Sequence, residues 1–142
     1  ALSLLPKHVI IDTVLVINGD LLTNVSLGDF LLFHESSGAD ISVCVREYES
    51  QIPFGVLETS GHVIHRIVEK PKTKVNVNAG IYLIEPEVLN GIEESAKFDM
   101  PELMSRCLDG KKAVHSYRIQ EQWIDIGRMS DFERASGLYG NG

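Results

Sequence analysis

The sequence of 142 residues has little of what marks many common classes of protein. It holds two cysteines, Cys44 and Cys107, and neither has a Cys or His nearby at metal-site spacing. Cys44 lies in an apolar alternation and Cys107 in a helical pattern, so we expect two buried thiols in a reducing compartment. No apolar run reaches the roughly 20 residues that cross a membrane, and we recognise no signal peptide. These features favour a cytoplasmic protein.

Positive charge is also scarce. Lysine and arginine number 13 against 20 acidic residues, and the net charge is -7. The chain therefore has no electrostatic footprint for nucleic acid or for an anionic membrane surface. The glycines form no phosphate-binding loop, the five histidines are scattered, and we find no nucleophilic triad. A phosphate would have to be held by a few placed cations or by a metal ion.

The composition is that of one globular domain, with 44% hydrophobic and 23% charged residues. We predict a single partial domain over residues 1–142, with 139–142 as a frayed tail. Ala1–Leu5 resembles the end of an apolar helix that stops at Pro6. A domain rarely begins in mid-helix, so we expect this chain to be a piece of a longer protein.

Strands and helices alternate along most of the chain. Ser26 and Asp99 are expected to cap helices that begin just after them, and Ser130–Glu133 is a capping box. A short helix is expected over Pro86–Gly91, and a polar loop over Tyr48–Pro53. Apolar or alternating runs predict strands at Val14–Ile17, Ile41–Arg46, Phe54–Glu58, Val63–Glu69, Ala79–Ile84, Ala113–Ile119 and Trp123–Gly127. Because a hairpin interrupts the alternation, we predict a three-layer α/β fold with a mixed sheet.

The prediction of a functional site starts from the stretch Val14–Asp20. Four apolar residues read as a central strand buried on both faces, and Asp20 follows at its carboxyl end, where open α/β sheets bind ligands. Asp125 also follows an apolar run, and each of the two lies close to a glycine. Either carboxylate could simply cap a turn. If the two converge, Mg²⁺ would relieve their repulsion and bind phosphate oxygens.

For the other candidate site residues, a structural role is as plausible as a functional one. Lys70 ends a strand before a proline and could direct its charge at an anion, or be a solvated lysine paired with Glu69. Gly55 and Gly80 could form a backbone floor for a ring, or mark bulges. Trp123 could belong to the core or wall a metal site.

Five segments in order resemble the sugar-phosphate nucleotidylyltransferases, also called nucleoside-diphosphate-sugar pyrophosphorylases. The segments are Leu15–Asp20, Phe54–Glu58, Glu69–Pro71, Asn78–Tyr82 and Trp123–Gly127. The resemblance implies a Rossmann-like nucleotidyltransferase fold. It also implies transfer of a nucleotidyl group from an NTP to a sugar 1-phosphate, which gives an NDP-sugar and pyrophosphate.

The resemblance also implies roles for single residues. Asp20 and Asp125 match the carboxylates that bind Mg²⁺, and Lys70 matches the lysine on the sugar phosphate. The matches to sugar contacts are Gly55, Glu69, Asn78, Ala79 and Gly80. Phe54 stands where many members have tyrosine. The family's Gly-rich loop, with its Arg and a later Lys, is absent, so the N-terminal part is missing and we expect the fragment to be inactive alone.

Two alternatives to this enzyme remain. A glycosyltransferase of the GT-A type would use an NDP-sugar, but its Asp-x-Asp pattern is missing because Leu21 and Leu22 follow Asp20. A non-catalytic sugar-nucleotide-binding or regulatory domain is the other. NTP and sugar 1-phosphate are the expected partners, whereas nucleic acid and membrane are not. A homo-oligomer and an upstream regulatory domain are left open, and similarity to CBS-containing relatives points to guanylyl transfer to an amino- or manno-type sugar.

Overall fold

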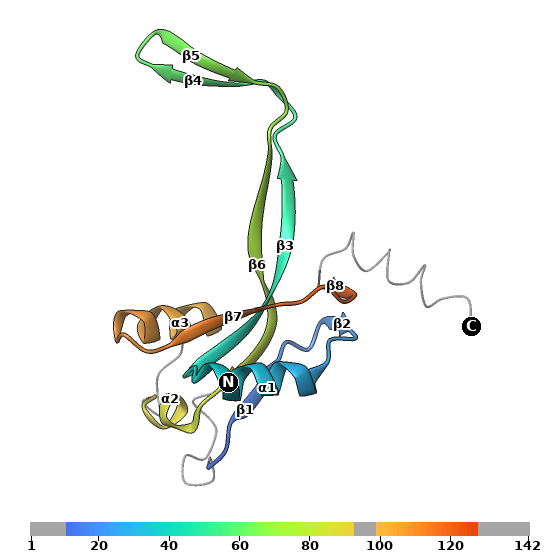
Figure 1. The fold of residues 1–142 in the computed structure, drawn as a ribbon, viewed down its shortest axis with the longest axis vertical. Coiled ribbons are helices and arrows are strands. Elements are labelled where there is room, and N and C mark those ends of the chain that lie inside the picture. The colour runs from blue at the N-terminus through green and yellow to red at the C-terminus, as the bar shows by residue number, and fades with distance from the viewer. Residues whose placement is uncertain (1–10, 93–98, 128–142) are drawn as a thin grey trace, which may run out of the picture. The chain divides into compact units, whose positions relative to one another are not determined.

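The computed structural model describes residues 11–92 and 99–127. The segments 1–5, 130–133 and 139–142, for which we predicted structure, lie outside these ranges. In chain order the elements are β1 (Val14–Ile17), β2 (Leu21–Thr23), α1 (Leu27–Ser37), β3 (Ile41–Gln51), β4 (Val56–Ser60), β5 (Val63–Val68), β6 (Lys72–Ile84), α2 (Pro86–Asn90), α3 (Met100–Asp109), β7 (Val114–Arg118) and β8 (Trp123–Asp125) (Figure 1).

The chain divides into two compact units. Unit 1 holds residues 1–45 and 78–142, and unit 2 holds residues 46–77. The boundaries fall inside β3 and inside β6. Each unit therefore contains part of both long strands.

Unit 1 contains three layers around a mixed sheet. The strand order is β1-β6-β3-β7, with β1 antiparallel to β6 and β3 parallel to β7. One face carries the cluster that includes Phe30 of α1, and the other carries the cluster that includes Leu89 of α2 and Leu103 of α3. The predicted three-layer α/β fold with a mixed sheet is confirmed.

The expected caps form at both longer helices. The Ser26 hydroxyl accepts a hydrogen bond from the Asp29 N–H at 3.2 Å, and Asp99 Oδ1 accepts one from the Glu102 N–H at 2.9 Å. Each cap binds one of the N–H groups that a helix start leaves unpaired. Cys44 and Cys107 are buried and free, as expected, and burial raises the pKa of the Cys44 thiol to about 12.

The prediction of a central strand buried on both faces is wrong for β1. This strand lies at the edge of the described sheet, and Leu15 and Ile17 are 40% and 45% exposed. Their register partners Leu83 and Ile81 are buried in the cluster beneath α1. A second strand and a covering layer beyond β1 would be needed to bury the alternate side chains, and the described residues supply neither.

The predicted polar loop over Tyr48–Pro53 is also wrong for its first four residues, because β3 continues to Gln51. Likewise β6 begins at Lys72, well before the expected start at Ala79. Ion pairs link these extensions, between Glu49 and Lys72 at 2.8 Å and between Glu47 and Lys74 at 2.8 Å. Polar sequences can form such exposed strands because side chains on neighbouring strands stabilise each other, without burial in a hydrophobic core.

Unit 2 ends in the predicted hairpin. β4 pairs antiparallel with β5, and the turn lies at Gly61 and His62. A register shift at Glu58/Thr59 interrupts the regular alternation that the sequence suggested. No helix among the described residues has the length and apolar character needed to cross a membrane.

Candidate functional site

The two predicted metal carboxylates are brought together by a ladder that the sequence did not reveal. β2 and β8 pair antiparallel, which sets Leu21 opposite Asp125. The Ile126 N–H also donates to the Asp20 carbonyl at 2.9 Å. Asp20 and Asp125 therefore lie side by side although 105 positions separate them.

The two carboxylates converge on the bare Cα of Gly127. A Cβ added to Gly127 would lie 2.7 Å from Asp20 Oδ2 and 3.1 Å from Asp125 Oδ1. The Gly127 N–H donates to Asp125 Oδ1 at 3.0 Å and orients that carboxylate. The chain thus keeps one small space open between two acidic oxygens.

Two carboxylates with an open space between them suit a hard cation. Mg²⁺ is commonly held by one or two carboxylates, and waters and substrate phosphates fill the remaining positions. Within residues 11–92 and 99–127, no cluster of three or more His, Cys, Asp or Glu side chains could bind a metal by itself. Any metal at Asp20 and Asp125 would therefore take its other ligands from solvent or substrate.

A second part of unit 1 carries the predicted sugar-lining strand. Gly80 has φ of +74°, and a Cβ there would lie 2.7 Å from Asn18 Nδ2. Glycine is required for both reasons. Asn78 fixes this backbone, because its Oδ1 accepts from the Gly80 N–H at 2.9 Å and its Nδ2 donates to the Tyr82 hydroxyl at 2.7 Å.

Trp123 links that strand to β8. Its indole Nε1–H donates to the Ala79 carbonyl at 2.8 Å, and the ring packs against the cluster beneath α1. The side chain is therefore part of the framework. It ties the strand of Asn78–Gly80 to the strand that carries Asp125.

Unit 2 brings Gly55, Glu69 and Lys70 together at the open end of its hairpin. A Cβ added to Gly55 would lie 2.9 Å from Glu69 Oε2. The Lys70 N–H donates to the Phe54 carbonyl at 3.3 Å. Phe54 is 72% exposed. The three predicted substrate-binding residues of this unit thus occupy one small region.

Lys70 has an unusual backbone. Its φ is +46°, in the left-handed region that costs a residue with a Cβ about 1–2 kcal/mol. It also precedes Pro71, which favours extended geometry at the residue before it. Such a conformation persists only where neighbouring contacts hold it, and these conformations concentrate at functional sites.

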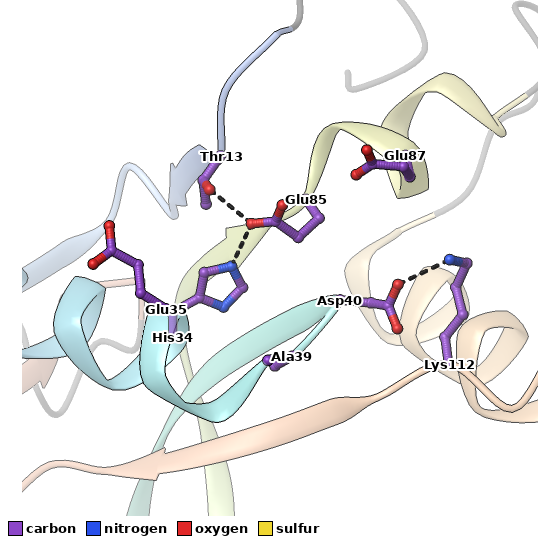
Figure 2. Close-up of a pocket in the computed structure, with 9 residues that line it drawn as sticks. Thr13, His34, Glu35, Ala39, Asp40, Glu85, Glu87 and Lys112 are labelled. Atoms are coloured by element: carbon purple, nitrogen blue, oxygen red, sulfur yellow. Dashed lines mark hydrogen bonds and ion pairs between the residues drawn. The ribbon is translucent and has the colours of Figure 1, made fainter.

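A cavity of about 560 Å³ lies elsewhere, at the edge of the sheet where β3 begins and β6 ends. Figure 2 shows its lining, in which Glu85 accepts from the Thr13 hydroxyl at 2.7 Å and contacts His34 at 2.9 Å. Lys112 pairs with Asp40 at 2.9 Å. Thr13 and Asp20 lie beyond opposite ends of β1, so this cavity contains none of the predicted site residues. Its polar side chains bind one another and stabilise the fold.

Sequence reasoning missed several features of the site. The sequence marks Gly127 only as a glycine near Asp125, and it indicates neither the contact of Asn18 with Gly80 nor the left-handed backbone of Lys70. The run of Asn, Gly and Asp at residues 18–20 does indicate that the strand ends there in a turn. Nothing in the sequence indicated that β2 and β8 would pair, because each strand is only three residues long.

The chain is similar to known proteins along nearly all of its length. The family model described as nucleotidyl transferase matches residues 3–141. A Sulfolobus acidocaldarius protein assigned as a mannose-1-phosphate guanyltransferase is 35% identical over 90% of this chain and 36% of its own length. The mannose-1-phosphate guanyltransferase of Schizosaccharomyces pombe is 30% identical over 87% of this chain and 35% of its own. The chain spans about a third of the length of these curated relatives.

Solved structures support the fold. A Bacillus anthracis protein assigned as a glucose-1-phosphate thymidylyltransferase, crystallised with sucrose, matches with a TM-score of 0.65 and 19% identity over 96% of this chain and 58% of its own. HddC of Yersinia pseudotuberculosis matches with a TM-score of 0.63 and 20% identity over 94% and 58%. The family that the five sequence segments predicted is therefore confirmed, and the chain belongs to the nucleotidyl transferase family.

Proposed function

We propose that the intact protein transfers a nucleotidyl group from an NTP to a sugar 1-phosphate, releasing pyrophosphate. The observation that carries this proposal is the convergence of Asp20 and Asp125 on the open Cα of Gly127. Membership of the nucleotidyl transferase family supports it. A glycosyltransferase is less well supported, since the two curated relatives carry the name mannose-1-phosphate guanyltransferase.

Asp20 and Asp125 would hold Mg²⁺, the two side chains acting as oxygen ligands. Bound there, the ion would neutralise charge on the reacting phosphates. Gly127 would keep the space between the carboxylates open, and its N–H would fix one rotamer of Asp125. These residues therefore supply placement and charge rather than a covalent intermediate.

Unit 2 would bind the sugar 1-phosphate. The Lys70 ammonium would hold the attacking phosphate, and Glu69 would accept hydrogen bonds from sugar hydroxyls. Gly55 makes room for the Glu69 carboxylate, because a Cβ there would collide with it. Asn78, Ala79 and Gly80 of unit 1 would line the sugar, with Gly80 offering bare backbone to the ring.

The substrate pair that the relatives favour is GTP with mannose 1-phosphate. Two relatives whose names state mannose-1-phosphate guanyltransferase activity are 35% and 30% identical to this chain. We propose the same substrates, in the cytoplasm, for the protein that contains this chain.

The experiment is pyrophosphate release by the full-length protein with Mg²⁺, a panel of NTPs and a panel of sugar 1-phosphates. We expect Asp20→Asn and Asp125→Asn each to lower turnover by about 100-fold or more, the scale at which removing one electrostatic group acts. Asp109→Asn, an exposed carboxylate at the end of α3, is the matched control and should retain full turnover. Near-normal turnover by Asp20→Asn and Asp125→Asn would exclude the metal role.

A further inference from the structure

We infer that Gln51 is a positioning residue for Lys70, holding its backbone in the conformation that directs the ammonium toward the sugar phosphate. This inference rests on the proposed function, because it assigns Gln51 a part in the role proposed for Lys70. It concerns contacts within unit 2 alone.

The need for positioning comes from the backbone of Lys70. Two residues other than glycine have a positive φ in the described ranges, Lys70 and Lys111. Lys111 follows the end of α3, where its N–H donates to the Leu108 carbonyl at 2.9 Å, so it closes a helix as a left-handed residue commonly does. Lys70 closes no helix, and its left-handed backbone has no such general explanation.

Three hydrogen bonds from one short segment hold Lys70 and its neighbour. The Phe54 carbonyl accepts from the Lys70 N–H at 3.3 Å, and the Ile52 N–H donates to the Pro71 carbonyl at 3.1 Å. Gln51 Nε2 donates to the Lys70 carbonyl at 3.2 Å. The first two bonds are between backbone groups and form with any side chains. The third depends on the identity of residue 51.

Gln51 therefore provides the side-chain hydrogen bond that holds the left-handed backbone of Lys70. Pro71 cannot donate a hydrogen bond, and its ring disfavours the conformation that Lys70 adopts. The amide of Gln51 stabilises the carbonyl that lies between the two residues. Without that bond, Lys70 can relax toward an extended backbone, which turns its side chain away from the direction fixed by the left-handed one.

The test is a double-mutant cycle in the full-length protein. Gln51→Met keeps the length of the side chain and removes the donor. Lys70→Met removes the ammonium. The measured quantities are kcat/KM for the sugar 1-phosphate, the KM for the NTP, and the unfolding transition of each variant. Gln120→Leu, an exposed glutamine outside the hairpin, is the matched control.

We expect Gln51→Met to lower kcat/KM for the sugar 1-phosphate by about fivefold, the effect of one ordinary hydrogen bond, with the KM for the NTP unchanged. Lys70→Met should lower kcat/KM for the sugar 1-phosphate by about 100-fold or more. Adding Gln51→Met to Lys70→Met should then have no further effect, because Gln51 acts through the missing ammonium. Gln120→Leu should match the wild type.

Each contrary result has a separate meaning. If Gln51→Met behaves like Gln120→Leu while Lys70→Met loses activity, the positioning role is wrong and the proposed function stands. An additive fivefold loss in the Lys70→Met background would also overturn the positioning role. Normal activity of Lys70→Met would remove the role of Lys70 itself, and with it that of Gln51.

Discussion

At the scale of single residues, the glycines of this chain differ in what surrounds their missing Cβ. A Cβ at Gly127 or Gly55 would meet a carboxylate oxygen within 3 Å, whereas one at Gly19 would meet nothing within 4 Å. All three glycines are exposed and lie near predicted site residues. Only the structure separates those that keep a site open from those that do not.

Gly127→Ala should therefore impair the metal site with little effect on folding. The new methyl group would displace Asp20 and Asp125 from their shared space, so we expect the Mg²⁺ concentration at half-maximal turnover to rise at least tenfold. The measurement is a Mg²⁺ titration of the full-length protein.

Gly19→Ala is the control for that prediction, because its Cβ has open space. It should leave the Mg²⁺ titration unchanged. Equal titration curves for the two alanine variants would contradict the assignment of Gly127.

Lys111→Gly should stabilise the protein. Lys111 has φ of +59° after the end of α3, a position that glycine occupies without the cost of a Cβ. We expect the free energy of unfolding to rise by about 0.5–1 kcal/mol relative to Lys111→Ala, which keeps the Cβ. Urea denaturation of both variants measures it, and no difference between them would contradict the prediction.

At the scale of elements, polar side chains rather than apolar ones join several strand and helix ends. Asp40, just before β3, accepts from Lys112 Nζ at 2.9 Å and from the Ala113 N–H at 2.8 Å. Glu85, just after β6, binds both Thr13 and His34. These contacts fix the edge of the sheet where β3 begins and β6 ends, and the candidate metal carboxylates lie beyond the other end of β1.

Asp40 makes this edge sensitive to acid. The hydrogen bond from Lys112, followed by that from the Ala113 N–H, lowers the pKa of Asp40 from its ordinary value of 3.8. Because the pKa is lower in the folded state, the stabilisation is complete above the ordinary pKa of 3.8 and is lost as the pH falls through the folded pKa. Solvent screens the pair, so we expect the carboxylate to contribute about 1 kcal/mol at pH 7.

Asp40→Asn tests this contribution as a function of pH. The variant should be less stable than the wild type by about 1 kcal/mol at pH 7. The difference should shrink as the pH falls below the ordinary value of 3.8, because the carboxyl is protonated first in the unfolded chain and at lower pH in the folded one. Chemical denaturation across the range measures it. A constant difference would mean that the ion pair contributes nothing.

At the scale of the whole molecule, the exposure of β1 and the greater length of the relatives both fit a chain that is part of a larger domain. Leu15 and Ile17 lie 40% and 45% exposed at the edge of the described sheet, and the chain spans about a third of the curated relatives. The sequence also contains no Gly-rich phosphate loop. We expect the nucleotide to be held by residues outside these 142.

The 142-residue chain alone should therefore not turn over. Mixed with Mg²⁺, NTPs and sugar 1-phosphates, it should release no pyrophosphate, whereas the full-length protein should. The reason is that a released pyrophosphate needs charged groups to hold it, and the sequence contains no Gly-rich phosphate loop that would supply them. Pyrophosphate release by the purified chain would contradict this expectation.

Much of the fold could be predicted because local patterns carry it. Ser26 and Asp99 identify their helix starts through side-chain bonds made within three residues. The hairpin of β4 and β5 was also visible, since its turn lies at Gly61. The extensions of β3 and β6 were missed because their stability comes from pairs such as Glu49 with Lys72, whose partners lie far apart in the sequence.

For the site, the order and chemistry of the residues were enough to identify the candidates Asp20, Glu69, Lys70 and Asp125. They also identified the family, because five short segments occur in a fixed order. The fold was needed to show that two distant carboxylates share one space at Gly127, and that Lys70 adopts a left-handed backbone. Both depend on pairing between segments that are remote along the chain, and local sequence patterns do not specify such pairing.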